Sequence, residues 1–102
     1  MNCLYLNAHS IMNKLDDLVA TVCVLRPDIV GITETWASER VDDAELMIAG
    51  YDMFRCDRPS SFRGGGVLLY VREELNAIGY ETKSKFPEQI WCKIFDRKGR
   101  RF

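Results

Sequence analysis

Two short apolar runs in this sequence each end in a polar side chain that could contact a metal ion. The run "CLYLN" ends in Asn7, and the run "DIVGITE" ends in Glu34. An amide and a carboxylate placed side by side offer oxygen ligands to a hard cation such as Mg2+, which keeps most of its waters. In the plainer interpretation Asn7 caps a turn and Glu34 is a solvated strand end, and spacing alone favours that interpretation.

His9 and a glycine run are the other candidates for chemistry. His9 is the single imidazole of the chain, and the sequence supplies no positioned carboxylate partner that would make it a general acid or base. The stretch "RGGG", residues 63–66, lacks the Gly-Lys-Ser/Thr sequence of a phosphate loop and precedes a strand pattern instead of a helix. We therefore interpret it as a tight loop that leads into a strand.

A strand–helix–strand unit would bring Asn7 and Glu34 to one edge of a sheet. Between the two apolar runs, hydrophobic residues recur at helical spacing, at Ile11, Leu15, Leu18, Val19, Val22 and Leu25. Ser10 is the expected N-cap of this helix, and Pro27 closes it. Such a unit within about 35 residues is typical of parallel βαβ structure, whose ligands bind at the carboxyl ends of the strands.

The remaining sequence predicts one helical turn at 42–46 and then mainly antiparallel strands. The strand patterns are "GYDMFRCDR" at 50–58, "GVLLYVRE" at 66–73, a weaker "AIGYETK" at 77–83 and "QIWCKIF" at 89–95. Residues 59–66 form a turn-rich break, and "DRKGR" at 96–100 is typical of a hairpin turn. Because Phe102 follows almost at once, the returning strand is barely begun, and we expect residues 1–102 to be a truncated domain.

The composition is that of a globular protein without a strong charge preference. Among 102 residues, 14 Lys and Arg balance 15 Asp and Glu, so only local patches could attract a polyanion. Those patches are Arg55, Arg58 and Arg63 in the middle, and Arg97, Lys98, Arg100 and Arg101 near the end. Four separated cysteines in apolar segments predict small buried hydrophobes, without a zinc site or a disulfide partner, in a reducing intracellular compartment. No apolar run is long enough to predict a membrane span.

Four stretches in order resemble a known family. They are "LYLNAHSIMNKLDDL", "RPDIVGITETW", "GYDMFRCDR" and "GGGVLLYVRE". The series resembles the endonuclease/exonuclease/phosphatase superfamily. The particular residues of these motifs are similar to the N-terminal part of the endonuclease domain of non-LTR retrotransposons of the LINE or jockey type. The resemblance implies the α/β fold class, as the N-terminal half of a four-layer α/β sandwich. Residues 1–102 would then lack the C-terminal half of that domain.

The resemblance also implies a function and its residues. Such proteins cleave phosphodiester bonds with Mg2+ or Mn2+, and retrotransposon members nick chromosomal DNA in the nucleus. Asn7 would order the metal, its water or the scissile phosphate, and Glu34 would bind the metal. DNA-repair relatives place an aspartate where this chain has His9, so no direct metal role transfers to His9.

The family's catalytic tyrosine, Asp-x-Asn motif and Asp-His pair have no counterpart in residues 1–102. With one ligand carboxylate, we expect a weak metal site and a chain that is inactive alone. Two alternatives stay open: a catalytically dead fragment or interaction module, and another superfamily phosphodiesterase or phosphatase. Without a second sheet, the apolar inner face of the first sheet would stay exposed to solvent, so we also expect the chain to be marginally stable.

Overall fold

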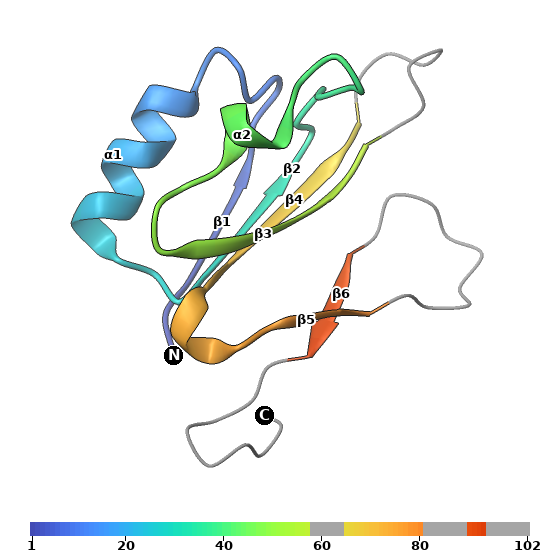
Figure 1. Ribbon diagram of the computed structural model, residues 1–102. Coiled ribbons are helices and arrows are strands. Elements are labelled where there is room, and N and C mark those ends of the chain that lie inside the picture. The colour runs from blue at the N-terminus through green and yellow to red at the C-terminus, as the bar shows by residue number, and fades with distance from the viewer. Residues whose placement is uncertain (58–64, 81–89, 94–102) are drawn as a thin grey trace.

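The computed structural model describes residues 1–57, 65–80 and 90–93 (Figure 1). Four strands form one sheet in the order β1-β2-β4-β3. They are β1 (Cys3–Asn7), β2 (Ile29–Thr33), β3 (Tyr51–Cys56) and β4 (Val67–Arg72). Strands β1 and β2 are parallel, whereas β4 is antiparallel to both of its neighbours. The predicted α/β fold, a βαβ unit followed by antiparallel strands, is confirmed.

Helix α1 (Leu15–Leu25) connects the two parallel strands and buries Leu18 and Val22 against the sheet. It ends as the sequence predicts. Arg26 takes the left-handed conformation (φ 47°) and donates its N–H to the Val22 carbonyl at 2.8 Å, and Pro27 follows.

The predicted start of this helix is wrong, because Ser10 is not its N-cap. Helix α1 begins at Leu15, after a turn over residues 11–14. Ser10 donates its main-chain N–H to the Glu34 carbonyl at 3.0 Å and has a φ of 85°, which no helix start allows. The chain is held against the loop after β2 at this point, so the helix forms only after the chain has turned away.

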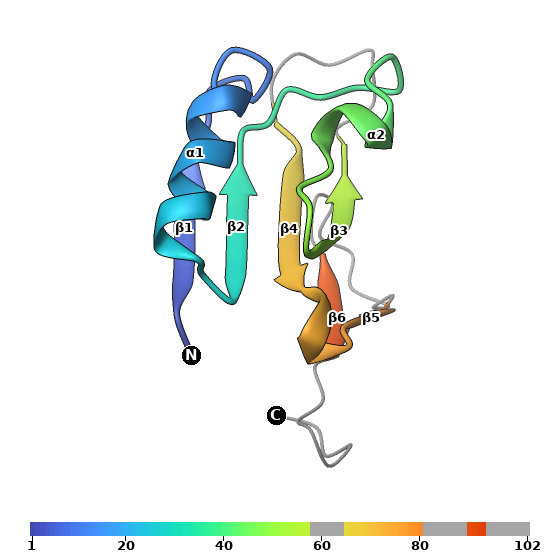
Figure 2. The same cartoon turned by 60° about the vertical axis from the view of Figure 1, so that its left-hand side comes forward.

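One face of the sheet, called the helix face here, is covered by α1 and by α2 (Asp43–Leu46) (Figure 2). Its buried side chains include Val30, Ile32, Leu68 and Tyr70, each 0% exposed. The Tyr70 hydroxyl donates to the Leu46 carbonyl at 2.6 Å, and burial raises the pKa of Tyr70 to about 12. The predicted helical turn at 42–46 is thus confirmed as α2, with a capping box formed by Asp42 and Glu45.

The opposite face, called the open face here, is covered only in part. A short 3-10 turn (η1, Glu73–Leu75) leads to β5 (Ile78–Tyr80), which pairs with β6 (Trp91–Lys93). A methyl group on Gly79 would lie 3.4 Å from the Phe54 ring, so β5 packs closely against the β3 part of this face. Over β1, by contrast, Tyr5 is 65% exposed, and its hydroxyl lies 2.8 Å from Thr33 Oγ1. Much of the β1–β2 part of this face therefore meets solvent.

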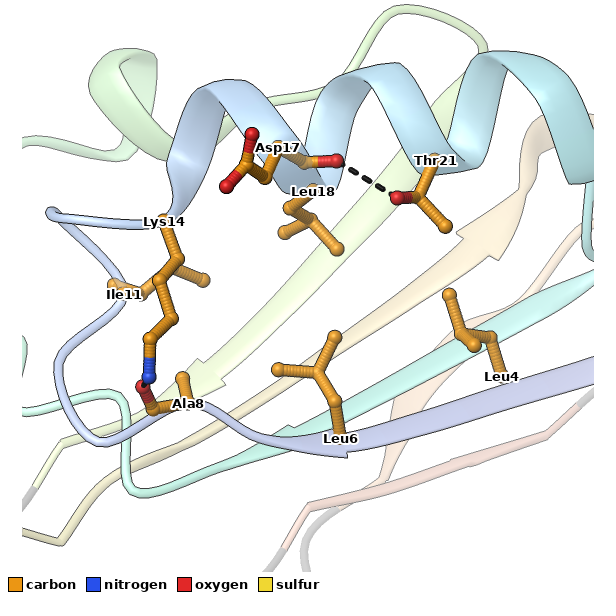
Figure 3. A pocket seen from close by; sticks show the side chains of 8 residues that line it. All are labelled: Leu4, Leu6, Ala8, Ile11, Lys14, Asp17, Leu18 and Thr21. Atoms are coloured by element: carbon orange, nitrogen blue, oxygen red, sulfur yellow. Dashed lines mark hydrogen bonds between the residues drawn. The ribbon is translucent and has the colours of Figure 1, made fainter.

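A groove of about 260 Å³ lies between α1 and β1 (Figure 3). It is lined by Leu4, Leu6, Ala8, Ile11, Lys14, Asp17, Leu18 and Thr21. The Lys14 ammonium donates to the Ala8 carbonyl across one end of the groove, and the Thr21 hydroxyl donates to the Asp17 carbonyl at 2.8 Å. Lys14 therefore ties the turn before α1 to the end of β1, and closes the loop that carries His9.

Arg55 is not part of an available basic patch, which corrects the interpretation of the sequence. Its guanidinium donates to Asp43 Oδ1 at 2.8 Å, to Asp57 Oδ2 at 2.6 Å and to the carbonyls of Val41 (2.8 Å) and Ser38 (3.0 Å). These bonds raise the pKa of Arg55, chiefly through Asp57. The side chain holds the segment before α2 onto β3. The other predicted patch members, at 58, 63, 97, 98, 100 and 101, lie outside the described residues, as does the predicted hairpin turn at 96–100.

Three of the four cysteines, those whose side chains the structure describes, also depart from the prediction. Cys3 and Cys23 are exposed, and Cys56 is half-buried. Cys3 lies on the open face of β1 and Cys23 on the outer side of α1, so neither reaches the core. Among the described helices, none is long and apolar enough to cross a membrane.

Candidate active site

The structure brings Asn7 and Glu34 to the same edge of the sheet. Asn7 ends β1 and pairs in register with Thr33, which ends β2, so Glu34 is the next residue along. Asn7 is exposed and Glu34 is half-buried. This edge holds the carboxyl ends of the parallel strands, where ligands of α/β sheets bind. The placement agrees with the sequence pattern, and the chemical roles of the two residues stay predictions.

Main-chain hydrogen bonds from the β1 side hold residues 34–36 in place. Ser10 N–H donates to the Glu34 carbonyl at 3.0 Å, and Ile11 N–H donates to the Thr35 carbonyl at 2.9 Å. The loop after β1 therefore stays hydrogen-bonded to the segment after β2 beyond the last paired residues of the two strands. These bonds explain why Asn7 and the helix that follows are separated by an irregular segment.

The glycine loop before β4 holds the same segment from the other side. Thr35 N–H donates to the Gly66 carbonyl at 3.3 Å, and Trp36 N–H donates to the Gly65 carbonyl at 2.8 Å. Both glycines have positive φ values, 72° for Gly65 and 90° for Gly66, which favour glycine. The prediction that this run is a tight loop leading into a strand agrees with its described part.

Close packing explains why position 66 carries no side chain. Thr35 is 1% exposed, and its Oγ1 accepts the Ala37 N–H at 3.3 Å. A Cβ added to Gly66 would lie 2.3 Å from that oxygen. The glycine loop and the segment at 34–36 are therefore in direct contact beside Glu34.

The Glu34 carboxylate accepts hydrogen bonds from Trp36 and from the glycine loop. Its Oε2 accepts the indole Nε1–H of Trp36 at 2.8 Å and the main-chain N–H of Gly65 at 3.4 Å. Glu34 and Trp36 both have a φ of 55°, an uncommon value for residues with side chains, which the bonds on both sides maintain. The His9 ring lies edge-on to Trp36, with centroids 6.3 Å apart and an interplanar angle of 79°.

The donor set at this edge suits a hard divalent cation. A carboxylate and an amide oxygen are the ligand types that Mg2+ and Mn2+ take, and Mg2+ needs only one or two carboxylates when waters and phosphates supply the rest. No group of three or more His, Cys, Asp or Glu side chains that could hold a metal occurs among residues 1–57, 65–80 and 90–93. Glu34 would thus be the single anionic ligand from this part of the chain.

Comparison with known proteins identifies the family. The family model for the endonuclease/exonuclease/phosphatase family matches residues 2–101. The chain belongs to this family. No curated protein sequence matches it.

Two solved structures of similar fold are AP endonucleases. One from Leishmania major has a TM-score of 0.75 and 14% sequence identity over 98% of this chain. One from Archaeoglobus fulgidus has a TM-score of 0.63 and 18% identity over 95% of this chain. The chain spans 37% of the length of each of them. At these identities the likeness establishes the fold, which family membership had led us to expect.

Trp36 and the two glycines are the site features that sequence reasoning missed. Trp36 was visible in "ETW", but the indole bond to Glu34 depends on the left-handed backbone of both residues, which no pattern predicts. The contact of Gly66 with Thr35 joins segments far apart in the sequence. Only the three-dimensional structure, in which the glycine loop pairs with residues 34–36, reveals this contact.

Proposed function

We propose that Asn7 and Glu34 form the metal-holding part of a DNA-nicking site of the non-LTR retrotransposon type. One observation carries the proposal: both residues lie at the carboxyl edge of the parallel β1–β2 pair, in a chain of a nuclease and phosphatase family. The retrotransposon assignment depends on the motif sequences "ETW", "FRCDR" and "GGGV". Phosphodiester hydrolysis of DNA with Mg2+ or Mn2+ is the reaction class, and the nucleus is the expected compartment.

Each residue has a distinct role in this proposal. Glu34 would bind the cation, which when bound supplies charge stabilisation to the phosphate oxygens. Asn7, with its exposed amide at the end of β1, would orient the phosphate or a metal-bound water by hydrogen bonding. Because residues 1–102 contain no Asp-His pair of the family type, nothing assigned here activates the attacking water. We therefore expect metal binding by the 102-residue chain without appreciable nicking.

Metal binding and nicking should be measured on the same preparation. Mn2+ binding is followed by the loss of the free Mn2+ signal in electron paramagnetic resonance, with Glu34→Gln as the matched variant because Gln keeps the size and removes the charge. Nicking is followed as conversion of supercoiled plasmid to open circles, with and without EDTA. An oligonucleotide with an abasic site tests the substrate named for the two AP endonucleases.

Each outcome decides between the proposals. Glu34-dependent Mn2+ binding without nicking supports the proposal as stated. Glu34-dependent nicking keeps the function and refutes the expected inactivity of the chain alone. Cleavage confined to the abasic oligonucleotide favours a repair-type substrate over the retrotransposon type. Absence of Glu34-dependent metal binding refutes the proposed site and favours the alternative of a catalytically dead fragment or interaction module.

A further inference from the structure

We propose that Trp36 is a positioning residue, whose indole N–H presets the Glu34 carboxylate for a divalent cation. The inference rests on the proposed metal role of Glu34 and extends it to a second side chain. Its basis is the 2.8 Å hydrogen bond from Trp36 Nε1 to Glu34 Oε2. Groups that hold a ligating side chain in one orientation tune the affinity of a metal site, although they never touch the metal.

Trp36 is itself fixed, which is the first requirement for a positioning residue. Its main-chain N–H donates to the Gly65 carbonyl at 2.8 Å, and its ring packs edge-on against His9. The indole is 49% exposed, so its contacts are made at the rim of the site and not in the core. The donor thus stays at one place relative to Glu34 while the edge of the sheet remains open to solvent.

The chemistry of the donor is the second requirement. An indole N–H only donates and carries no charge. A Lys or Arg at position 36 would bring a positive charge that competes with the cation, whereas the indole N–H orients Oε2 without adding a charge of its own. The bond restricts the rotamers of Glu34 before the ion arrives, so the side chain loses less freedom on binding.

The test measures metal affinity, because the chain is expected to be inactive alone. Trp36→Phe keeps an aromatic ring beside His9 and removes the N–H. Trp91→Phe makes the same chemical change at the other tryptophan and serves as the matched control. We expect Trp36→Phe to bind Mn2+ about 10- to 100-fold more weakly than the wild type, the usual effect of losing such a partner, and Trp91→Phe to bind unchanged. Far-UV circular dichroism checks that each variant is folded.

A spectroscopic signal separates positioning from a general structural effect. In Trp91→Phe, Trp36 is the only indole, so its fluorescence should change saturably on adding Mg2+, with the affinity found for wild-type binding. If Trp36→Phe fails to fold, this measurement decides alone: a constant emission while Mn2+ binds overturns the inference.

Failure of the inference differs from failure of the site. Mn2+ binding by Trp36→Phe within about twofold of the wild type overturns the positioning role and leaves the proposed function intact. Wild-type binding that survives Glu34→Gln, or no binding at all, overturns both.

Discussion

Gly66→Ala should destabilise the protein far more than the same change at Gly50, although both positions need a left-handed backbone. The φ value is 90° at Gly66 and 88° at Gly50. An alanine pays about 1 to 2 kcal/mol for that conformation at either position. At Gly50 nothing lies within 4 Å of the added Cβ, whereas at Gly66 the Cβ would lie 2.3 Å from Thr35 Oγ1. Gly50→Ala therefore measures the backbone term alone.

The additional cost at Gly66 comes from Thr35, whose side chain is buried (1% exposed) and must shift or rotate to admit the new Cβ. Overpacking of this kind costs about 1 to 3 kcal/mol, and rotating the hydroxyl away gives up the bond from Ala37 N–H, worth about 1 kcal/mol. We expect a total of roughly 3 to 6 kcal/mol for Gly66→Ala, against about 1 to 2 for Gly50→Ala.

Urea unfolding followed by circular dichroism measures the difference. A gap of about 2 kcal/mol moves the urea midpoint by about 1 to 2 M for a small domain. A constant concentration of a stabilising osmolyte keeps the folded baselines measurable for a chain of low stability. Thr35→Ala removes the clashing oxygen, so in that background Gly66→Ala should cost no more than Gly50→Ala does. Equal midpoints for the two single glycine variants would refute the contact between the glycine loop and Thr35.

Three further predictions concern the rest of the fold. Arg55→Gln should lower the free energy of unfolding by about 2 to 3 kcal/mol in a urea titration, because Asp57 loses its charged partner and two carbonyls lose their donor; an unchanged midpoint would contradict the network. Stability should fall as the pH rises from 10 to 12. Below pH 10 the Tyr70 phenol is protonated in both states, and above it the unfolded chain ionises first because the folded pKa is about 12. Tyr70→Phe should be less stable than the wild type at neutral pH. Its free energy of unfolding should also fall less than that of the wild type between pH 10 and 12. A dye that binds exposed hydrophobic surface should bind the folded chain, since Tyr5 on the open face is 65% exposed; cooperative melting without dye binding would exclude this.

The sequence predicted the elements that form the carboxyl edge because their signals are local. An apolar run that stops at Asn7, helical spacing closed by Pro27, and a β-branched run that stops at Glu34 together specify a βαβ unit. The parallel register then follows from the fold, which places Asn7 opposite Thr33. The predicted turn at 42–46 is local as well, and the structure shows the capping box of Asp42 and Glu45 that stabilises it.

The errors came where a tertiary contact overrode a local signal. Ser10 is a good N-cap by type, but its N–H is used by the Glu34 carbonyl, so the helix starts later. Arg55 looked like a surface charge in a basic stretch, yet partners from α2 and from the segment before it hold it half-buried on β3. Cys3 sits in an apolar strand, but β1 turns that side of its backbone to the open face.

The carboxyl edge and the open face are organised by different parts of the chain. The bonds that hold residues 34–36 come from the loop after β1 and from the glycine loop, and they join main-chain atoms at one end of the sheet. Tyr5 and its neighbours on the open face point away from the helices and meet solvent along the strands. Wetting of the open face therefore lowers the stability of the whole sheet without directly removing the contacts that fix Glu34. A low melting temperature and an ordered carboxyl edge would therefore be compatible in this chain, and Mn2+ affinity is the measurement that tests whether this edge binds metal as proposed.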